Sequence, residues 1–292
     1  MPYGRIVFFG TSEIAIPTLQ FLSVNGLVGV VTQPDHGPFG PVKRVALEFG
    51  VPILQPDKVR DAVAEIQALK PDLIVVLSYG QILPKAILEM AKACLNLHAS
   101  LLPRHRGASP IQAAILSGDI ETGMTVMHMA PGLDDGDILL RRVIPIASNE
   151  TGGSLHDRLA VLAVDALRDA LDGHRPFPRT PQEHNLANMT RKLSKEQGAI
   201  DWTQSAVQIE RVVRAYNPFP GAHCLLGGKP LKIHAAEVVD GTGSPGAVVC
   251  IGKDFLDIGT GTGLLRLREV QSPGKKRMWT GDWLRGARLQ AT

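Results

Sequence analysis

Three polar side chains that could carry out acyl transfer lie in segments that otherwise resemble buried strands and tight loops. Asn96 and His98 end an apolar run and are two positions apart, so an extended segment places them on one face. Asp134 lies downstream in a loop rich in Gly and Asp. A carboxamide can donate to a developing oxyanion, an imidazole can donate or carry a proton, and a carboxylate can orient that imidazole. The three groups suit attack of an amine on a carbonyl carbon, and we expect them to converge.

The rest of the sequence favours direct transfer over a covalent intermediate, because no Ser or Cys stands in a recognisable nucleophile elbow. Two neighbouring carboxylates, Asp135 and Asp137, compete with Asp134, although Asp-Gly pairs are also typical of tight turns. His105 and His128 are interpreted as a surface residue and a strand residue.

Short apolar runs alternate with helical patterns through the first 170 or so residues, which predicts a parallel sheet covered by helices on both faces. Ligands of such sheets bind beyond the carboxyl ends of the strands, and Asn96 and His98 lie at such an end. Strands are expected at 6–9, 28–31, 52–54, 73–77, 94–97, 123–129 and 138–146, and helices at 14–22, 42–48, 59–69 and 84–93.

The chain then changes character. Leu and Ala at spacings of three and four predict a long amphipathic helix at 154–171, and a polar, proline-rich stretch follows at 172–181. Beyond a helix at 205–216, short strands at 223–226, 230–239, 246–252, 255–259 and 263–270 predict a small barrel. We therefore predict a catalytic domain at 1–181, a linker at 182–202 and a C-terminal barrel domain at 203–292.

The composition is that of an ordinary soluble globular protein: 292 residues, 44% hydrophobic, 20% charged and a net charge of +3. That charge does not indicate a dedicated nucleic-acid binder, although a local basic face could still bind RNA. Three widely spaced cysteines have no metal-ligand spacing and are interpreted as reduced thiols, so no metal is expected. No apolar run approaches the ~20 residues of a membrane span, and the strand-like start leaves no targeting segment, so we expect a cytoplasmic protein.

The segment Asn-Leu-His at 96–98, with Ser-Leu-Leu-Pro at 100–103 and Leu-Asp at 133–134, resembles the signature of formyltransferases that use 10-formyltetrahydrofolate. Four further stretches make the methionyl-tRNA formyltransferase family the closest resemblance, from about residue 6 to 284; they lie at 32–35, 79–84, 192–202 and 274–276.

The resemblance implies a doubly wound, Rossmann-like α/β domain followed by an open five-stranded barrel of the oligonucleotide-binding (OB) type. It also implies formyl transfer to the α-amino group of methionyl initiator tRNA, through a tetrahedral intermediate. A monomer is expected.

The resemblance assigns roles residue by residue. The catalytic residues it implies are Asn96, His98 and Asp134, with Asp134 chosen over its neighbours because it matches the family's Leu-Asp position. The residues it implies for binding the formyl donor are Ser100, Leu101, Leu102, Pro103, Gln81, Ile82 and Leu83. Cations that could bind tRNA phosphates, in a basic groove between the domains, are Lys43, Arg44, Lys192, Lys195, Arg211, Arg214, Lys275 and Lys276.

One departure from the family concerns the acceptor. The tRNA enzymes usually carry a long basic loop after Thr-Gln-Pro-Asp at 32–35, whereas here only residues 36–40 precede the next helix. Fewer cations mean fewer phosphate contacts. The alternative acceptor is therefore an amino-sugar nucleotide, since related enzymes also have a short first loop. Hydrolysis of the formyl donor and non-catalytic RNA binding by the barrel are two further alternatives, and the intact catalytic trio opposes the last.

Overall fold

The computed structural model describes residues 3–35, 37–173 and 177–287. By its internal contacts the chain divides into two compact units. The first unit comprises Met1–Pro110, Glu121–Pro145 and His156–Arg191, and the second comprises Ile111–Ile120, Ile146–Leu155 and Lys192–Thr292. In the part of the chain that the structure describes, no helix is long and apolar enough to cross a membrane.

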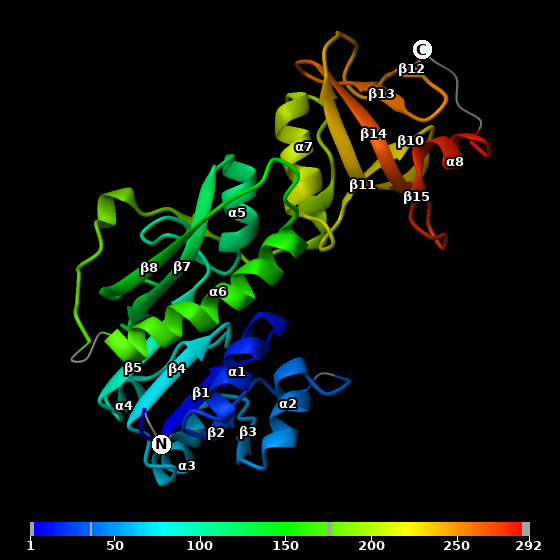
Figure 1. The fold of residues 1–292 in the computed structure, drawn as a ribbon. Helices are drawn as coiled ribbons and strands as arrows, with labels where there is room; N and C mark the ends of the chain where they lie inside the picture. Colours follow the sequence, from blue (N-terminus) through cyan, green and yellow to red (C-terminus); the bar gives the residue numbers. More distant parts are fainter. Residues whose placement is uncertain (1–2, 36, 174–176, 288–292) are drawn as a thin grey trace. The chain divides into compact units, whose positions relative to one another are not determined.

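A seven-stranded mixed sheet forms the centre of the first unit, in the order β3-β2-β1-β4-β5-β7-β8 (Figure 1). The strands are β1 (Ile6–Gly10), β2 (Leu27–Val31), β3 (Ile53–Leu54), β4 (Leu73–Leu77), β5 (Ala93–His98), β7 (Glu121–His128) and β8 (Ile138–Pro145). The first five are parallel, whereas β7 and β8 are antiparallel. All seven predicted strands are confirmed, and β1 and β4 are buried along their whole length, as near-continuous apolar runs require.

Helices connect and cover these strands: α1 (Ile16–Ser23), α2 (Pro41–Ala46), α3 (Val63–Ala68), α4 (Lys85–Leu88) and α6 (Gly152–Gly173). The prediction of a helix at 84–93 was too long, because α4 ends at Leu88 and Ala93 already belongs to β5. Leu159, Ala163 and Leu167 make a fully buried stripe on α6. An ion pair from Arg142 of β8 to Asp169 fixes that helix at the sheet.

Among the elements that were not predicted, one α-helix and two strands come before Lys192. They are α5 (Pro110–Ser117) and a two-stranded parallel ladder in which β6 (Arg106–Gly107) pairs with β9 (Met189–Thr190). The ladder lies within the first unit, so residues up to 191 of the predicted linker at 182–202 belong to that unit. The second unit begins at Lys192. Residue 36 of the short loop and Pro176 of the proline-rich stretch lie outside the described residues.

The second unit is an antiparallel sheet in the order β10-β11-β14-β13-β12, covered by α7 (Ala206–Ala215). Its strands are β10 (Ala222–Leu226), β11 (Lys229–Val239), β12 (Val248–Ile251), β13 (Leu256–Gly259) and β14 (Leu264–Gln271). The five predicted strands are confirmed, and a sixth short one, β15 (Met278–Trp279), pairs with β14 before α8 (Thr280–Leu284). Ile209 and Val213 of α7 pack into the core of this sheet. Ser205 caps α7 by accepting a hydrogen bond from the Gln208 backbone N–H.

Candidate active site

Strand β5 supplies two of the three predicted catalytic side chains. Asn96 and His98 are 8% and 6% exposed, and they pair across the sheet with Met127 and Thr125 of β7. Their alternate positions on one strand direct both side chains to the same face. The parallel part of the sheet makes this the carboxyl end of β5, where α/β sheets bind ligands.

The loop between β7 and β8 brings Asp134 to His98. It leaves the sheet beside the start of β5, where Met129 N–H donates to the Cys94 carbonyl (2.8 Å), so its tip must fold back toward the other end of that strand. Asp134 has a left-handed backbone (φ 50°), which Asp tolerates better than most residues. Its Oδ2 lies 3.5 Å from His98 Nδ1 and accepts a hydrogen bond from Gly107 N–H at 2.8 Å. The predicted convergence of the imidazole and the carboxylate is therefore present.

The surroundings of His98 identify the nitrogen that is available for chemistry. Nε2 lies 2.9 Å from the carbonyl oxygen of His105. A carbonyl can only accept, so Nε2 carries the hydrogen and donates it. Nδ1 therefore remains to exchange a proton or to donate to a substrate oxygen, and it faces Asp134. At 3.5 Å this contact is longer than a good hydrogen bond, which leaves Nδ1 able to turn to a ligand.

Asn96 has its amide group uncommitted. Among the described residues, the Asn96 carboxamide forms no hydrogen bond, and its polar atoms are not fully enclosed, so a ligand can reach them. The carboxamide is thus free to donate to an oxygen that develops negative charge beside His98.

The turn that follows His98, residues 100–103, is held rigidly and is here called the donor turn. Thr125 Oγ1 donates to the Ser100 carbonyl (2.6 Å) and accepts from Leu102 N–H (3.2 Å). Arg141 Nε donates to the Leu102 carbonyl at 2.9 Å. Ser100, Leu102 and Pro103 are buried, whereas Leu101 is partly exposed. Leu101 is therefore the member of the turn that can contact a ligand, and the other members fix its position.

The other residues predicted to bind the donor differ in their surroundings. Gln81 ties several loops together, since its Oε1 accepts from Val59 N–H (2.8 Å) and its Nε2 donates to Gln33 (3.2 Å). Leu83 is buried in the core of the sheet, and Ile82 is 74% exposed. Of these three, only Ile82 offers a large free apolar surface.

The competing carboxylates and histidines have distinct environments. Asp137 forms an exposed ion pair with Arg179 at 3.6 Å. Asp135 Oδ1 is buried without a hydrogen-bond partner among the described residues. The interpretation of His105 as a surface residue was wrong, because it is 2% exposed and its carbonyl contacts His98. His128 is a strand residue as predicted, at the end of β7.

The predicted tRNA-binding cations fall into two groups. Arg44, Lys192, Lys195, Lys275 and Lys276 are exposed. Three others already have partners within the protein. Lys43 pairs with Asp35, whose carboxylate also accepts from Gly40 N–H, and it lies 4.3 Å from the Phe39 ring centroid. These contacts close the short loop after β2 on itself.

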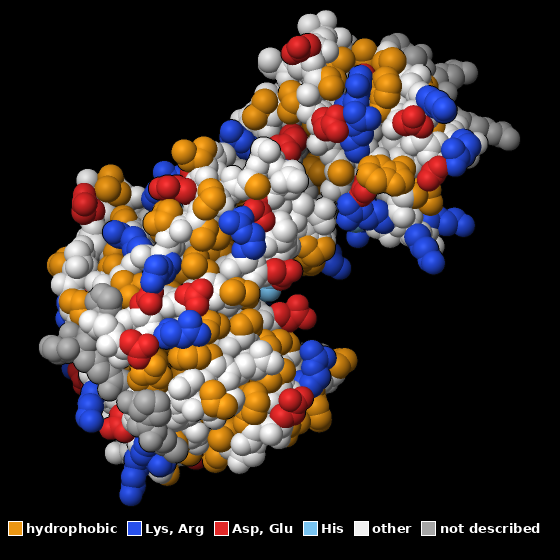
Figure 2. Space-filling view, viewed as in Figure 1, with side chains coloured by type: hydrophobic (Ala, Val, Ile, Leu, Met, Phe, Trp, Pro, Cys, Tyr) orange, Lys and Arg blue, Asp and Glu red, His pale blue; other side chains and the backbone are white. Residues whose placement is uncertain are grey.

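The other two engaged cations are on α7. Arg214 donates to Glu210 and to the Glu150 carbonyl. The Arg211 guanidinium lies against Gly118, in the space that a Cβ at that position would fill. On the face shown in Figure 2, basic and acidic side chains are interspersed, which agrees with the near-neutral composition.

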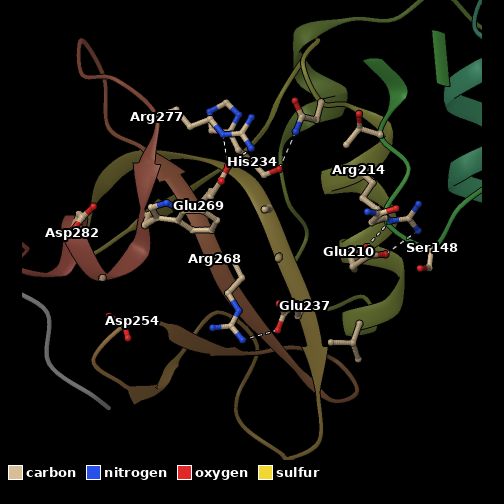
Figure 3. Close-up of a pocket in the computed structure, with 18 residues that line it drawn as sticks. Ser148, Glu210, Arg214, His234, Glu237, Asp254, Arg268, Glu269, Arg277 and Asp282 are labelled. Carbon is tan, nitrogen blue, oxygen red and sulfur yellow. Dashed lines mark hydrogen bonds and ion pairs between the residues drawn. The ribbon is translucent and has the colours of Figure 1, made fainter. Parts of the chain in front are cut away.

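A cavity of about 960 Å³ lies within the second unit, lined by α7, β11, β14, β15 and residues 148–151 (Figure 3). Its arginines are paired: Arg268 with Glu237 on the neighbouring strand, and Arg277 with Glu269. The lining holds five carboxylates and three arginines, a balance that disfavours an anionic ligand. None of the predicted catalytic residues lines this cavity, so it is not the site of the chemistry described above.

Three residues around the His98–Asp134 pair were missed as contributors to its geometry. Gln182, 5% exposed, and Asn188 lie in the stretch predicted to be a linker. Arg106 is 6% exposed and donates to Gln182. The only signal in the sequence was the occurrence of an uncharged amide in a segment with no other pattern, which is too weak for an assignment.

Comparisons with known proteins identify the family of this chain. The formyl transferase model matches residues 5–171, and the model of the formyl transferase C-terminal domain matches residues 192–288. A methionyl-tRNA formyltransferase from Geobacter metallireducens is 45% identical over 98% of this chain and 96% of its own length. One from Stutzerimonas stutzeri is 47% identical over the same shares of the two proteins.

Solved structures show the same fold at lower identity. HypX from Aquifex aeolicus matches with a TM-score of 0.66 and 20% identity, over 98% of this chain and 48% of HypX. An N-formyltransferase from Helicobacter canadensis, solved with folinic acid and dTDP-3-aminofucose, matches with a TM-score of 0.67 and 16% identity, over 90% and 98% of the two chains. Because both family models match and the curated relatives are nearly half identical along their whole length, the chain belongs to the methionyl-tRNA formyltransferase family, within the formyl transferases.

Proposed function

We propose that this enzyme transfers the formyl group of 10-formyltetrahydrofolate to the α-amino group of methionyl initiator tRNA, with Asn96, His98 and Asp134 as its catalytic residues. The observation that carries the chemistry is the 3.5 Å approach of Asp134 to His98 Nδ1 on a strand that also presents a free Asn96 carboxamide. The acceptor is supported by relatives of 44–47% identity that are named methionyl-tRNA formyltransferase.

The proposed reaction forms one carbon–nitrogen bond and breaks another. The amine attacks the formyl carbon, and the carbonyl electrons move onto the oxygen. Asn96 and His98 Nδ1–H donate to that oxyanion; loss of one such donor typically costs ~3–4 kcal/mol of barrier. The amine then loses a proton toward Asp134, the bond from carbon to N10 breaks, and N10 takes up a proton. Tetrahydrofolate and formyl-methionyl-tRNA are the products.

The donor turn and the exposed Ile82 would bind the flat rings of tetrahydrofolate. Leu101 supplies apolar contact next to His98, and the hydrogen bonds of Thr125 keep the turn in place before the ligand arrives. A preformed turn avoids the entropic cost of ordering a loop on binding.

The exposed lysines are the proposed contacts to tRNA phosphates, namely Lys192 and Lys195 in the segment that begins at Lys192 and belongs to the second unit, and Lys275 and Lys276 before β15. Lys43 and Arg214 are weaker candidates because both are already paired with carboxylates. A phosphate-binding groove between the domains and a monomeric state stay predictions of the sequence. We place the reaction in the cytoplasm, where tRNA is charged and used.

A second acceptor class, the amino-sugar nucleotides, is favoured by one observation, the short loop closed by Asp35 and Lys43. One assay separates the two. Purified enzyme receives radiolabelled 10-formyltetrahydrofolate with initiator Met-tRNA, elongator Met-tRNA, uncharged initiator tRNA or a panel of amino-sugar nucleotides. We expect label on initiator Met-tRNA and none on uncharged tRNA. Label on an amino sugar alone would replace the proposed acceptor, and release of free formate alone would indicate a hydrolase.

A further inference from the structure

One short segment, residues 182–190, reaches the His98–Asp134 pair at three separate points, although it lies about 50 residues beyond Asp134 in the chain. We call this segment the brace. It follows the bridge at Thr180 and ends with the β6-β9 ladder, all within the first unit.

The first contact is made by the side chain of Gln182. Its Nε2 donates to the carbonyls of Asp134 (2.9 Å) and Gly136 (2.7 Å), and its Oε1 accepts two hydrogen bonds from Arg106 (3.1 and 2.7 Å). Both amide hydrogens and both oxygen lone pairs are thus in use. Gln182 therefore has no capacity left to bind a substrate, and what it can do is hold the backbone on both sides of Asp135.

The second contact is made by Asn188. Its Oδ1 accepts from the backbone N–H of His105, and its Nδ2 lies 3.2 Å from the His105 ring Nδ1. The carbonyl of the same His105 accepts from His98 Nε2. Asn188 thus fixes the peptide segment that orients the imidazole and selects its tautomer.

The third contact passes through Gly107. Thr190 Oγ1 donates to the Arg106 carbonyl at 3.0 Å, and the brace lies so close that a Cβ on Gly107 would be 2.4 Å from the Thr190 carbonyl oxygen. Gly107 also has a left-handed φ of 105°, so only glycine suits the position. The N–H of this glycine is the donor to Asp134 Oδ2.

We infer that the brace positions the reaction centre, with Gln182 and Asn188 as positioning residues that set the separation and orientation of Asp134 and His98. Each contact ends on a group that directly touches one of these two residues, and Asp134 itself stands in a left-handed conformation that needs external support. The inference rests on the proposed function, because it assigns roles relative to the proposed catalytic residues.

Two substitutions separate positioning from simple stability. Gln182→Glu keeps an oxygen for Arg106 but replaces the amide donors by a second oxygen, which repels the Asp134 and Gly136 carbonyls. Asn188→Asp keeps an acceptor for His105 N–H and removes the Nδ2 contact to the ring. The matched control is Gln208→Glu, because Gln208 Oε1 accepts from Ser205 in the cap of α7 and glutamate keeps that acceptor.

We expect kcat to fall about 10- to 100-fold in both brace variants, since a displacement of about 1 Å at a reaction centre can cost 100-fold. The KM for 10-formyltetrahydrofolate should stay within about threefold of wild type, and the control should match wild type throughout. Gln182→Glu should also lower Tm, because two buried carbonyls lose their donors, so kcat is measured at a temperature where circular dichroism shows every variant fully folded. A kcat within twofold of wild type under those conditions would overturn the inference.

A second measurement does not depend on the acceptor. In protein labelled with ¹³C at histidine rings, with His98 assigned from His98→Gln, the His98 signal should shift in both brace variants and not in Gln208→Glu. Unshifted His98 signals would overturn the brace even if the enzyme were active. Conversely, if the wild-type enzyme does not formylate Met-tRNA but the His98 signal still shifts in the brace variants, the proposed function is refuted and the positioning role of the brace is kept.

Discussion

Replacement of Asp134 by Asn tests the proposed chemistry most directly, because it removes a charge and little else. Asn can keep an oxygen for Gly107 N–H, and the contacts of Gln182 to the backbone do not involve the substituted side chain. The lost interaction is that of the carboxylate with a proton on His98 Nδ1, 3.5 Å away. Both side chains are largely buried, at 14% and 7% exposure. With an effective dielectric constant of about 20, that interaction is worth about 5 kcal/mol.

A loss of this size in the transition state corresponds to between about three and four orders of magnitude in rate, since ~1.4 kcal/mol is tenfold. We therefore expect Asp134→Asn to lower kcat about 1,000- to 10,000-fold while the KM for 10-formyltetrahydrofolate and the Tm change little. Single-turnover formylation of initiator Met-tRNA measures the chemical step without product release.

Two neighbouring variants make the comparison specific. Asp137→Asn should leave kcat near wild type, because Asp137 only pairs with exposed Arg179. Asp135→Asn tests the other buried carboxylate, and we expect a smaller effect than at Asp134 because His98 contacts Asp134. A kcat for Asp134→Asn within tenfold of wild type, or a larger loss in Asp135→Asn, would refute the assignment of Asp134.

Three further outcomes are expected. Thr125→Val should raise the KM for 10-formyltetrahydrofolate several-fold and lower Tm, because two buried backbone groups of the donor turn lose their hydrogen-bond partner. Each loss costs about 1–3 kcal/mol of stability, and an unchanged KM would contradict the role of that turn. The double variant Lys275→Ala/Lys276→Ala should raise the KM for Met-tRNA about 3- to 10-fold, make the salt dependence of that KM shallower, and leave the turnover of the formyl donor unchanged. An unaltered KM for Met-tRNA would exclude these lysines as phosphate contacts. Burial, and then the charge of Arg179, hold the pKa of His128 below 6.5. As the pH drops below about 6.5, the unfolded chain therefore takes up a proton before the folded protein does, and stability falls. The decrease in Tm from pH 7.5 to 5 should be smaller in His128→Gln, and equal decreases would contradict this cause.

The elements of the first sheet were predictable because their signals are local. A buried parallel strand needs a continuous apolar run, as in 73–77, and a helix that covers it needs apolar residues every three or four positions, as in 154–171. Element ends were less predictable. Residues 84–93 had helical spacing, yet Ala93 pairs with Leu73 in the sheet, and this tertiary contact overrides local preference.

The catalytic side chains were identified from their chemical types and from resemblance to the family, and the structure places two of them in contact. The role of the segment at 182–190 could not be predicted, since a polar stretch without periodicity is typical of a linker. Its importance depends on hydrogen bonds from side chains to the backbone of residues 105 and 134, and such bonds leave no periodic pattern in the sequence.

The sequence by itself determined which groups are available and which face of a strand they share, because residue type and alternation are properties of the local chain. Only the tertiary structure decided that the loop after β7 folds back, so that Asp134 meets His98 rather than water. That outcome depends on the path of the loop and on the partners that fix it, Gly107 and Gln182 above all. Contacts between residues so far apart in the chain become specific only when the whole first unit has folded around them.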